Sequence, residues 1–415
     1  MAPGLWAELS TTTCGYSPSW SEFPEFSYIC QVLGAANGTL GAVEMLDALL
    51  EFLAIPSVGG TAAETDAQRW VADTMRSWNW DVEVWQDDPL ASADLPDFPG
   101  MEVPRAQVTG VIGRPRGSTG RRLILGHTDV VPGGPAPRRE GERVIGRGSV
   151  DMKSGMVAGM FAAREAGGDV AVCAVSGEED GGIGAFLALQ HGLTAAQCVI
   201  PEPTGLTIMP ANAGSLTFRV TLPGVSAHGA RRWDGHNALE AVPEVLQRLR
   251  DLETQRNTDV PEVLSSWPIA YPISVGRIHG GDWPSTVMAQ VSLEGRYGVA
   301  LGETNADAMT AFEKALAGTG AQVEWFGGRF ASAALPSDDP LIAQLQTAHA
   351  EVAGNPPAVI GGTYGSDLRQ LIRAGIACVQ YGPGDAALAH SEDEEVAVAD
   401  VFQCREVLQR WLQGA

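Results

Sequence analysis

Basic residues, and lysine above all, are scarce in this sequence. Among 415 residues there are 27 Lys and Arg against 50 Asp and Glu, which gives a formal net charge of −23 at pH 7. Lysine occurs only as Lys153 and Lys314. Because a surface this acidic repels phosphate backbones and anionic lipids, we expect neither nucleic acid nor a membrane surface as a partner.

Long apolar runs and paired cysteines are also missing. No stretch reaches the roughly 18 apolar residues that a membrane span requires. The first basic residue is Arg69, so the sequence before it lacks the basic segment of a secretory signal. The six cysteines are scattered without a CxxC pair, which argues against a disulfide scaffold and a cysteine zinc site. The expected location is the cytoplasm.

The length and the 45% hydrophobic content predict more than one globular domain. Short apolar strands alternate with helical patterns along most of the chain, which is typical of an α/β fold with a doubly wound, mostly parallel sheet. The predicted strands are 123–125, 170–175, 198–200 and 376–381. The predicted helices are 43–55, 67–78, 153–166, 182–191, 339–353 and 398–412.

A different order interrupts this pattern in the second half. The segments 215–222, 236–252, 271–278, 287–297, 303–317 and 321–326 predict the βαββαβ order of a ferredoxin-like α+β domain. The predicted organisation is therefore a discontinuous catalytic domain at 41–211 and 329–415, with a smaller domain inserted at 212–328. Residues 1–40 form an N-terminal extension of unclear role.

Acidic residues and histidines gather where the predicted strands end. Because the carboxyl ends of parallel strands meet at one edge of a sheet, these side chains should converge. Carboxylates packed together repel one another unless a cation neutralises them. Two imidazoles with several carboxylates and no thiolate suit Zn²⁺, or Co²⁺ or Mn²⁺ in its place. The residues concerned are His127, Asp129, Glu178, Glu179, Glu202 and His390, and Asp151, just before a predicted helix, is a further candidate.

Two ions that share one carboxylate would form the two-metal geometry of hydrolases, which lowers the pKa of a bound water and polarises a carbonyl. One further carboxylate is then needed to take the proton of the water. The consecutive Glu178 and Glu179 can supply both a base and a ligand. A single strand-end acid is more often a helix cap, so the prediction depends on the convergence of the whole set.

Six segments of the sequence carry a family resemblance. In order they are GHTDVVP, GRGSVDMKSG, SGEED, PEPTG, GVSAHGA and AHSEDEE. Together they resemble the di-zinc aminoacylase family, which includes acetylornithine deacetylase, succinyl-diaminopimelate desuccinylase, bacterial glutamate carboxypeptidases and related dipeptidases. The resemblance extends from about residue 43 to the end of the sequence.

The resemblance implies a role for each residue of the site. It implies two divalent ions, most simply Zn²⁺, a homodimer formed through the inserted domain, and a histidine that reaches the partner's active site. His127 and Glu202 resemble the ligands of one metal, Glu179 and His390 resemble those of the second, and Asp151 resembles the carboxylate that bridges them. Glu178 resembles the general base, and Asp129 resembles the carboxylate that orients His127. His228 resembles the group that stabilises the oxyanion across the dimer.

The substrate pocket is where the sequence departs from the family pattern. The family often has an Asn-x-x-Pro segment in the inserted domain, and here the matching residues 285–288 lack both the Asn and the Pro. Arg296 and the turn that contains Gly362 and Thr363 are kept. Arg296 and Arg369 could bind a substrate carboxylate, although internal salt bridges would explain either residue equally well.

The function expected from these observations is hydrolysis of an amide bond in a small N-acylated amino acid or amine, as in acetylornithine deacetylase. A dipeptidase or carboxypeptidase with the same machinery is the main alternative, and deformylation of a small amine is another. A non-catalytic protein that only binds acyl compounds is a distant possibility, because the position of the base is occupied by Glu178.

Overall fold

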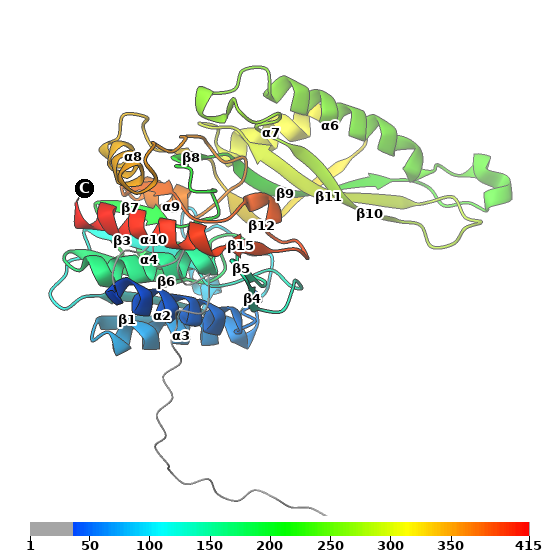
Figure 1. Cartoon of the computed structure of the whole chain (residues 1–415). Helices are drawn as coiled ribbons and strands as arrows, with labels where there is room; N and C mark the ends of the chain where they lie inside the picture. Colours follow the sequence, from blue (N-terminus) through cyan, green and yellow to red (C-terminus); the bar gives the residue numbers. More distant parts are fainter. Residues whose placement is uncertain (1–35, 415) are drawn as a thin grey trace, which may run out of the picture. The chain divides into compact units, whose positions relative to one another are not determined.

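The computed structural model describes residues 36–414 (Figure 1). The chain divides into two units between Asp47 and Ala48, within the helix α2 (Ala36–Leu53). All sheets among the described residues, and the site described below, belong to the second unit, Ala48–Ala415. Most of the predicted N-terminal extension, residues 1–35, lies outside the described residues.

The larger sheet has six strands in the order β1-β2-β6-β3-β7-β14. The last four of these are mutually parallel. At one edge, β2 pairs antiparallel with β6, and β1 pairs antiparallel with β2. This arrangement confirms the predicted mostly parallel sheet and all four predicted strands. The strands are β1 (Asp81–Asp87), β2 (Val108–Arg114), β3 (Arg122–His127), β6 (Val170–Val175), β7 (Gln197–Ile200) and β14 (Ala377–Gln380).

Helices cover both faces of this sheet. On β3, Leu123 and Leu125 pack into the apolar cluster that includes Leu368 of α9, whereas Ile124 faces α4. A Cβ on Gly159 of α4 would lie 2.6 Å from Ile124, so this glycine is what lets the helix approach the sheet. The helices of this part are α3 (Ala62–Ser77), α4 (Lys153–Ala166), α5 (Ile183–Gln190), α8 (Pro340–Ala353), α9 (Leu368–Arg373) and α10 (Val398–Gln413).

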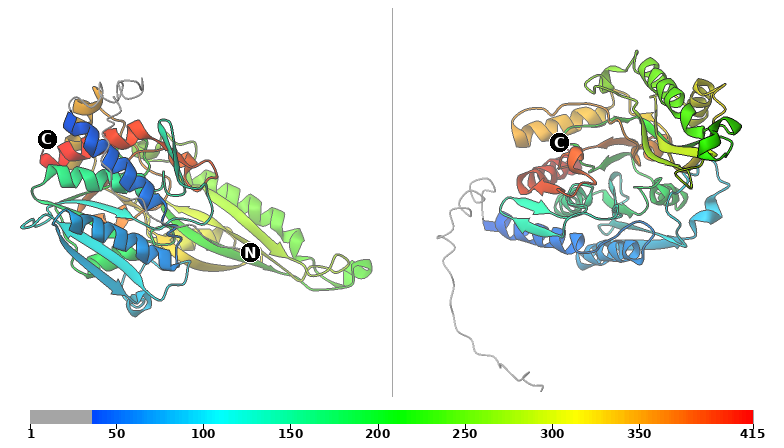
Figure 2. Two further views of the ribbon diagram at one scale, coloured as in Figure 1. Left: turned by 60° about the horizontal axis from the view of Figure 1, so that its bottom comes forward. Right: turned by 90° about the vertical axis from the view of Figure 1, so that its right-hand side faces the viewer.

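The smaller sheet is fully antiparallel, in the order β10-β11-β9-β12. Together with α6 and α7, which cover one face (Figures 1 and 2), it confirms the predicted βαββαβ order. Its core contains Phe218, Tyr297 and Phe312. The elements are β9 (Gly214–Pro223), α6 (Val242–Arg256), β10 (Ile273–Gly280), β11 (Gln290–Val299), α7 (Asn305–Ala315) and β12 (Gln322–Phe330).

Short elements connect the two sheets and support the loops of the site. The chain enters the smaller sheet from β8 (Ala211–Asn212) and leaves it into β13 (Ala333–Ala334), and these two strands pair with each other. A three-stranded sheet of β4 (Arg138–Glu140), β5 (Arg143–Ile145) and β15 (Glu395–Ala397) joins two segments far apart in sequence. The 3₁₀ helices are η2 (Pro89–Ser92), η3 (Gly229–Asp234), η4 (Ala238–Ala241), η5 (Glu262–Leu264) and η6 (Ala386–Leu388).

None of the helices among the described residues is both long and apolar enough to cross a membrane.

His349 on α8 gives the fold a measurable dependence on pH. Its Nδ1 lies 2.8 Å from the hydroxyl of Tyr381, and burial lowers its pKa from the ordinary 6.5. The unfolded chain therefore takes up a proton at this imidazole more readily than the folded protein does, so the free energy of unfolding should fall as the pH drops below about 6.5. Urea denaturation at about pH 7.5 and 5.5 should show a smaller loss for His349→Gln than for the wild type, and equal losses would refute this.

Candidate metal centre

Two groups of potential ligands lie at the carboxyl edge of the larger sheet and share one residue. His127, Asp151 and Glu202 form one group, and Asp151, Glu179 and His390 form the other. Within each group the ligand atoms all lie within 4.8 Å of one another. The structure thus brings all five predicted metal ligands together, with Asp151 in the shared position.

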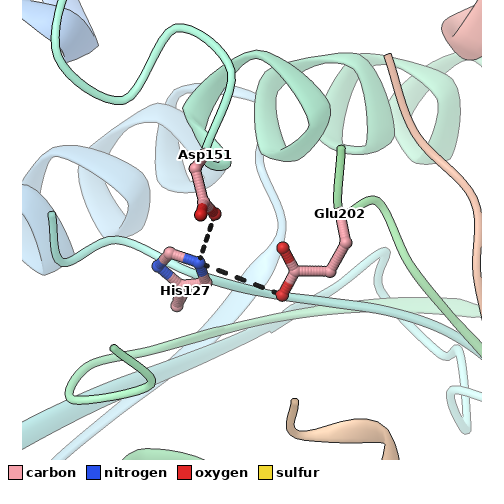
Figure 3. A group of neighbouring side chains, drawn as sticks. All are labelled: His127, Asp151 and Glu202. Atoms are coloured by element: carbon pink, nitrogen blue, oxygen red, sulfur yellow. Dashed lines mark hydrogen bonds and ion pairs between the residues drawn. The ribbon is translucent and has the colours of Figure 1, made fainter. Parts of the chain in front are cut away.

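The first group is built around His127, the last residue of β3 (Figure 3). Its Nε2 lies 3.1 Å from Asp151 Oδ1 and 3.9 Å from Glu202 Oε1. Its Nδ1 lies 3.0 Å from the main-chain oxygen of Asp129, which can only accept a hydrogen bond. Nδ1 therefore carries a proton, and a metal ion that replaces the proton on Nε2 would be held by the Nε2 lone pair together with Asp151 and Glu202.

The second group comes from three separate loops. His390 Nε2 lies 3.0 Å from Glu179 Oε2 and 3.4 Å from Asp151 Oδ2. His390 adopts a left-handed backbone conformation, with φ of 63°, and about half of its side chain is exposed. The other oxygen of Glu179, Oε1, is buried and has no hydrogen-bond partner among the residues that the structure describes. An unpaired buried carboxylate oxygen beside an imidazole is what a cation would complete.

The electrostatics of the two histidines also favour a cation. Burial lowers the pKa of His127, but its hydrogen bond to Asp151 and the charges of Glu202 and Asp129 outweigh this and raise it well above 6.5. Hydrogen bonds to Asp151 and Glu179 raise the pKa of His390 to about 10. The cluster therefore stabilises added positive charge, as expected of a set of carboxylates that fits divalent metal ions.

Glu178 belongs to neither ligand group. Its carboxylate is buried, and burial followed by the charge of Glu202 raises its pKa well above the usual 4.5. It lines a cavity of about 480 Å³ together with Asp151, Glu179, Glu202 and His390. A basic carboxylate beside a cluster of potential metal ligands, inside a cavity of ligand size, is placed to exchange protons with a bound molecule.

Asp129 holds the site in a different way from the one predicted. Its side chain accepts hydrogen bonds from the backbone N–H groups of Glu178, at 3.3 Å, and Glu179, at 3.2 Å. Its nearest carboxylate oxygen is 3.6 Å from His127 Nδ1, and the imidazole is held instead by the main-chain oxygen of Asp129. The carboxylate therefore anchors the loop that carries Glu178 and Glu179.

The predicted substrate-binding residues divide into two sets. Arg296 lines the 480 Å³ cavity and donates to the main-chain oxygen of Thr363 at 2.8 Å. Arg369 is buried elsewhere, donates to the main-chain oxygens of Ser366 and Gly181, and lines a separate cavity of about 900 Å³. Gly362 and Thr363 are not among the residues that line the smaller cavity, but Tyr364, Gly365 and Ser366 are.

His228 does not reach this cavity within one chain. It caps η3, and its Nδ1 accepts a hydrogen bond from the N–H of Ala230 at 3.1 Å. It is exposed, and it is not among the residues that line the cavity with Glu178.

Glu394 has a role that the sequence did not reveal. Glu394 is fully buried and accepts hydrogen bonds from the backbone N–H groups of Gly148, Val150 and Asp151. Arg147 pairs with its second oxygen. Glu394 therefore shapes the loop that presents Asp151.

Removing this support should weaken metal binding. Glu394→Ala is expected to lower metal affinity about 10- to 100-fold, because groups that orient a metal ligand typically contribute that much. Glu392→Ala is the matched control, since Glu392 is exposed on the same loop. Titration of the metal-stripped proteins with Co²⁺, followed by absorbance, measures both affinities, and equal affinities for the two variants would contradict the assignment.

Several residues that line the cavity were missed at the sequence level. Tyr364 and Ser366 directly follow the turn at Gly362 and Thr363, so their position beside a recognised segment was a usable signal. Glu102 and Phe330 also line the cavity. They lie in a loop and at a strand end without a recognisable motif, so only the tertiary structure places them there.

Comparison with known proteins agrees with this fold and site. The model of peptidase family M20/M25/M40 matches residues 123–414. A Mycobacterium tuberculosis protein that carries the name succinyl-diaminopimelate desuccinylase is 30% identical over 305 residues, which cover 71% of this chain and 82% of that protein. An Aspergillus terreus protein that carries the name carboxypeptidase is 26% identical over 416 residues, covering 92% of this chain and 88% of that protein.

The fold is shared with solved structures of the same kind. An M20 family metallo-carboxypeptidase from Sulfolobus solfataricus aligns with a TM-score of 0.68 at 16% identity, over 89% of this chain and 98% of that chain. The fold, the clustered ligands and these relatives define a metal-dependent hydrolase that acts on amide bonds. The chain belongs to the peptidase family M20/M25/M40.

Proposed function

We propose that this protein removes the acyl group from a small N-acylated amino acid or related amine. The observation that carries the proposal is the place of Glu178, buried in a cavity beside two ligand groups that share Asp151. Two divalent ions, Zn²⁺ in the first instance and Co²⁺ or Mn²⁺ as substitutes, would activate water and polarise the carbonyl there. His127 and Glu202 would hold one, Glu179 and His390 the other, and Asp151 both.

In this mechanism the protein moves one proton. Glu178 takes it from the water that attacks the amide carbonyl, and then gives it to the nitrogen of the leaving amine as the carbon–nitrogen bond breaks. The raised pKa of Glu178 makes its carboxylate a stronger base for the first of these steps. The products are a carboxylate and a free amine.

Arg296 is the proposed contact for a carboxylate of the substrate. Among the described residues no acidic side chain forms an ion pair with it, and burial lowers its pKa. A half-buried guanidinium that lines the cavity and has no acidic partner among the described residues is suited to a bidentate bond with a carboxylate. This feature favours substrates with a free carboxylate, which both N-acyl amino acids and carboxypeptidase substrates carry.

Loss of Arg296 should therefore act mainly on substrate binding. Arg296→Met is expected to raise KM about 10- to 100-fold for substrates with a free carboxylate, as removal of a charged hydrogen bond does. Arg76→Met is the control, because Arg76 is exposed on α3 and is not among the residues that line the cavity. If the substitution raised KM as much for a substrate whose carboxylate is amidated as for the free acid, Arg296 would not be the carboxylate contact.

The substrate class is tested by a hydrolysis panel. N-acetyl, N-succinyl and N-formyl amino acids and amines are compared with dipeptides and C-terminal peptide substrates, with Zn²⁺ or Co²⁺ present. The highest kcat/KM is expected on an N-acyl amino acid. Activity on dipeptides or peptides alone would contradict the proposal and support the dipeptidase or carboxypeptidase alternative. Activity on N-formyl amines alone would support the deformylase alternative. Binding of acyl compounds without any turnover would indicate a non-catalytic binder.

We also propose a homodimer in which His228 of one subunit completes the site of the other. Trp283 and Ile278, near the exposed edge strand β10, are 70% and 54% exposed, and Trp233 beside His228 is 73% exposed. Large apolar side chains exposed this far commonly mark an interface, and an edge strand can pair with a second chain. His228 would then help stabilise the oxyanion.

Subunit complementation gives a direct test of this dimer. His228→Ala and Glu178→Gln should each be inactive alone, yet mixing them should restore activity, because one site of the mixed dimer then holds both native residues. Size-exclusion chromatography reports the oligomeric state of each sample. A fully active monomer, or an active His228→Ala variant, would refute the proposal.

A further inference from the structure

We propose that Arg105 is a positioning residue, which fixes the loop of Glu178 and Glu179 through a buried ion-pair cluster with Glu64 and Asp180. The proposal rests on the proposed function, since it takes Glu178 as the base and Glu179 as a metal ligand. Arg105 lies in the loop before β2 and was not singled out in the sequence.

The guanidinium of Arg105 joins two acids from distant parts of the chain. Its Nη1 donates to Asp180 Oδ2 at 2.8 Å, and its Nε lies 3.1 Å from Glu64 Oε2 near the start of α3. The side chain of Arg105 is 2% exposed, and those of Glu64 and Asp180 are each 7% exposed. Bonds this well shielded are hardly screened by solvent.

Both acids are tied to backbone as well. Glu64 Oε2 accepts a hydrogen bond from the N–H of Gly60 at 2.6 Å. Asp180 Oδ2 accepts from the N–H groups of Glu102, at 3.1 Å, and Val103, at 2.8 Å. The cluster thus connects the beginning of α3, the loop before β2 and the loop after β6 in one rigid network.

Arg105 touches the catalytic loop on both sides of Glu178 and Glu179. Asp180 follows Glu179 directly. On the other side, a Cβ added to Gly177 would lie 3.3 Å from Arg105 Cζ, and Gly177 has a φ of 74°. The guanidinium is therefore packed under Gly177 and bonded to Asp180, while Asp129 binds the two N–H groups between them. The loop is held at three points.

This cluster does not itself touch the reaction space. Arg105 and Glu64 line a different cavity, of about 340 Å³, and neither is among the residues that line the cavity of Glu178. Buried ion pairs contribute little net stability compared with apolar packing, whereas a small misplacement of a catalytic group lowers the rate strongly. The expected consequence of disturbing Arg105 is a loss of kcat with KM nearly unchanged.

Lysine is the informative replacement at this position. Arg105 bonds Glu64 through Nε and Nη2 and Asp180 through Nη1, and lysine, whose donors all sit on one terminal nitrogen, cannot reproduce this geometry. Arg105→Lys keeps the charge but breaks the bridge, and Asp180→Asn keeps the shape but removes the ion pair. Arg256→Lys is the matched control, since Arg256 forms a shielded pair with Glu303 in the smaller sheet's domain and lies away from the cavity.

The experiment measures kcat, KM, metal content and thermal unfolding of the full-length metal-loaded proteins. Arg105→Lys and Asp180→Asn should each lower kcat at least tenfold with KM within about threefold, whereas Arg256→Lys should keep its kcat even if it unfolds at a lower temperature. The proposal would be overturned if Arg105→Lys and Asp180→Asn both kept a kcat within twofold of the wild type. It would also be overturned if these variants changed KM as strongly as kcat. If Arg105→Lys does not fold, Asp180→Asn alone decides.

A failure of the positioning role of Arg105 can be distinguished from a failure of the proposed function. If Glu178→Gln is inactive but Arg105→Lys and Asp180→Asn are fully active, only the positioning role is refuted. If Glu178→Gln keeps the wild-type kcat, the base assignment fails, whatever the Arg105 variants do.

Discussion

Replacing Glu178 with glutamine is expected to lower kcat by about 10²- to 10⁴-fold, while the metal content of the protein stays unchanged. The substitution preserves size but removes the group that can take a proton. Glu178 belongs to neither ligand group, so metal binding should not depend on it. Steady-state kinetics and elemental analysis of the same preparation measure the two quantities.

The neighbouring residue provides the matched control. Glu179→Gln makes the same chemical change one position along the chain, but Glu179 belongs to the ligand group with Asp151 and His390. It should lose metal as well as activity. If Glu178→Gln also lost its metal, or if it retained wild-type turnover, the assignment of Glu178 as base and Glu179 as metal ligand would be wrong.

Replacing Asp151 with asparagine is expected to remove most of both metal ions and with them the activity. Asp151 is shared by the two ligand groups, and hydrogen bonds from His127 and His390 outweigh burial and hold its pKa well below the usual range. Asparagine has the same shape without the charge, and a neutral amide is a much poorer ligand for a hard divalent ion.

Two variants that each affect only one ligand group provide the comparison for Asp151→Asn. His390→Ala and Glu202→Gln each remove a ligand from only one group, so each should retain about one ion per chain, against two for the wild type. Elemental analysis after reconstitution and dialysis counts the ions. One ion per chain in the wild type, or two in Asp151→Asn, would show that Asp151 does not bridge.

The parallel part of the fold and the ligand types were predictable, whereas the antiparallel edge was not. Strands β3, β6, β7 and β14 are apolar runs buried on both faces, which the sequence displays directly. Strand β1 is an edge strand with mostly exposed or half-buried residues, and β2 precedes the first recognised segment. Helix α9 has only six residues. Strand β1 is too exposed and helix α9 too short to carry a clear pattern, whereas β2 is almost fully buried, with two glycines that interrupt its apolar run.

The sequence by itself determined which residue types end the parallel strands, and therefore where two imidazoles and several carboxylates converge. Strand ends are local features, so hydrophobic patterns locate them. Only the tertiary structure decided what supports these residues. Glu394 binds the loop of Asp151 from 243 positions away in the sequence, and Arg105 reaches Asp180 across 75. Such partners are fixed by packing between distant segments, and no local pattern encodes them.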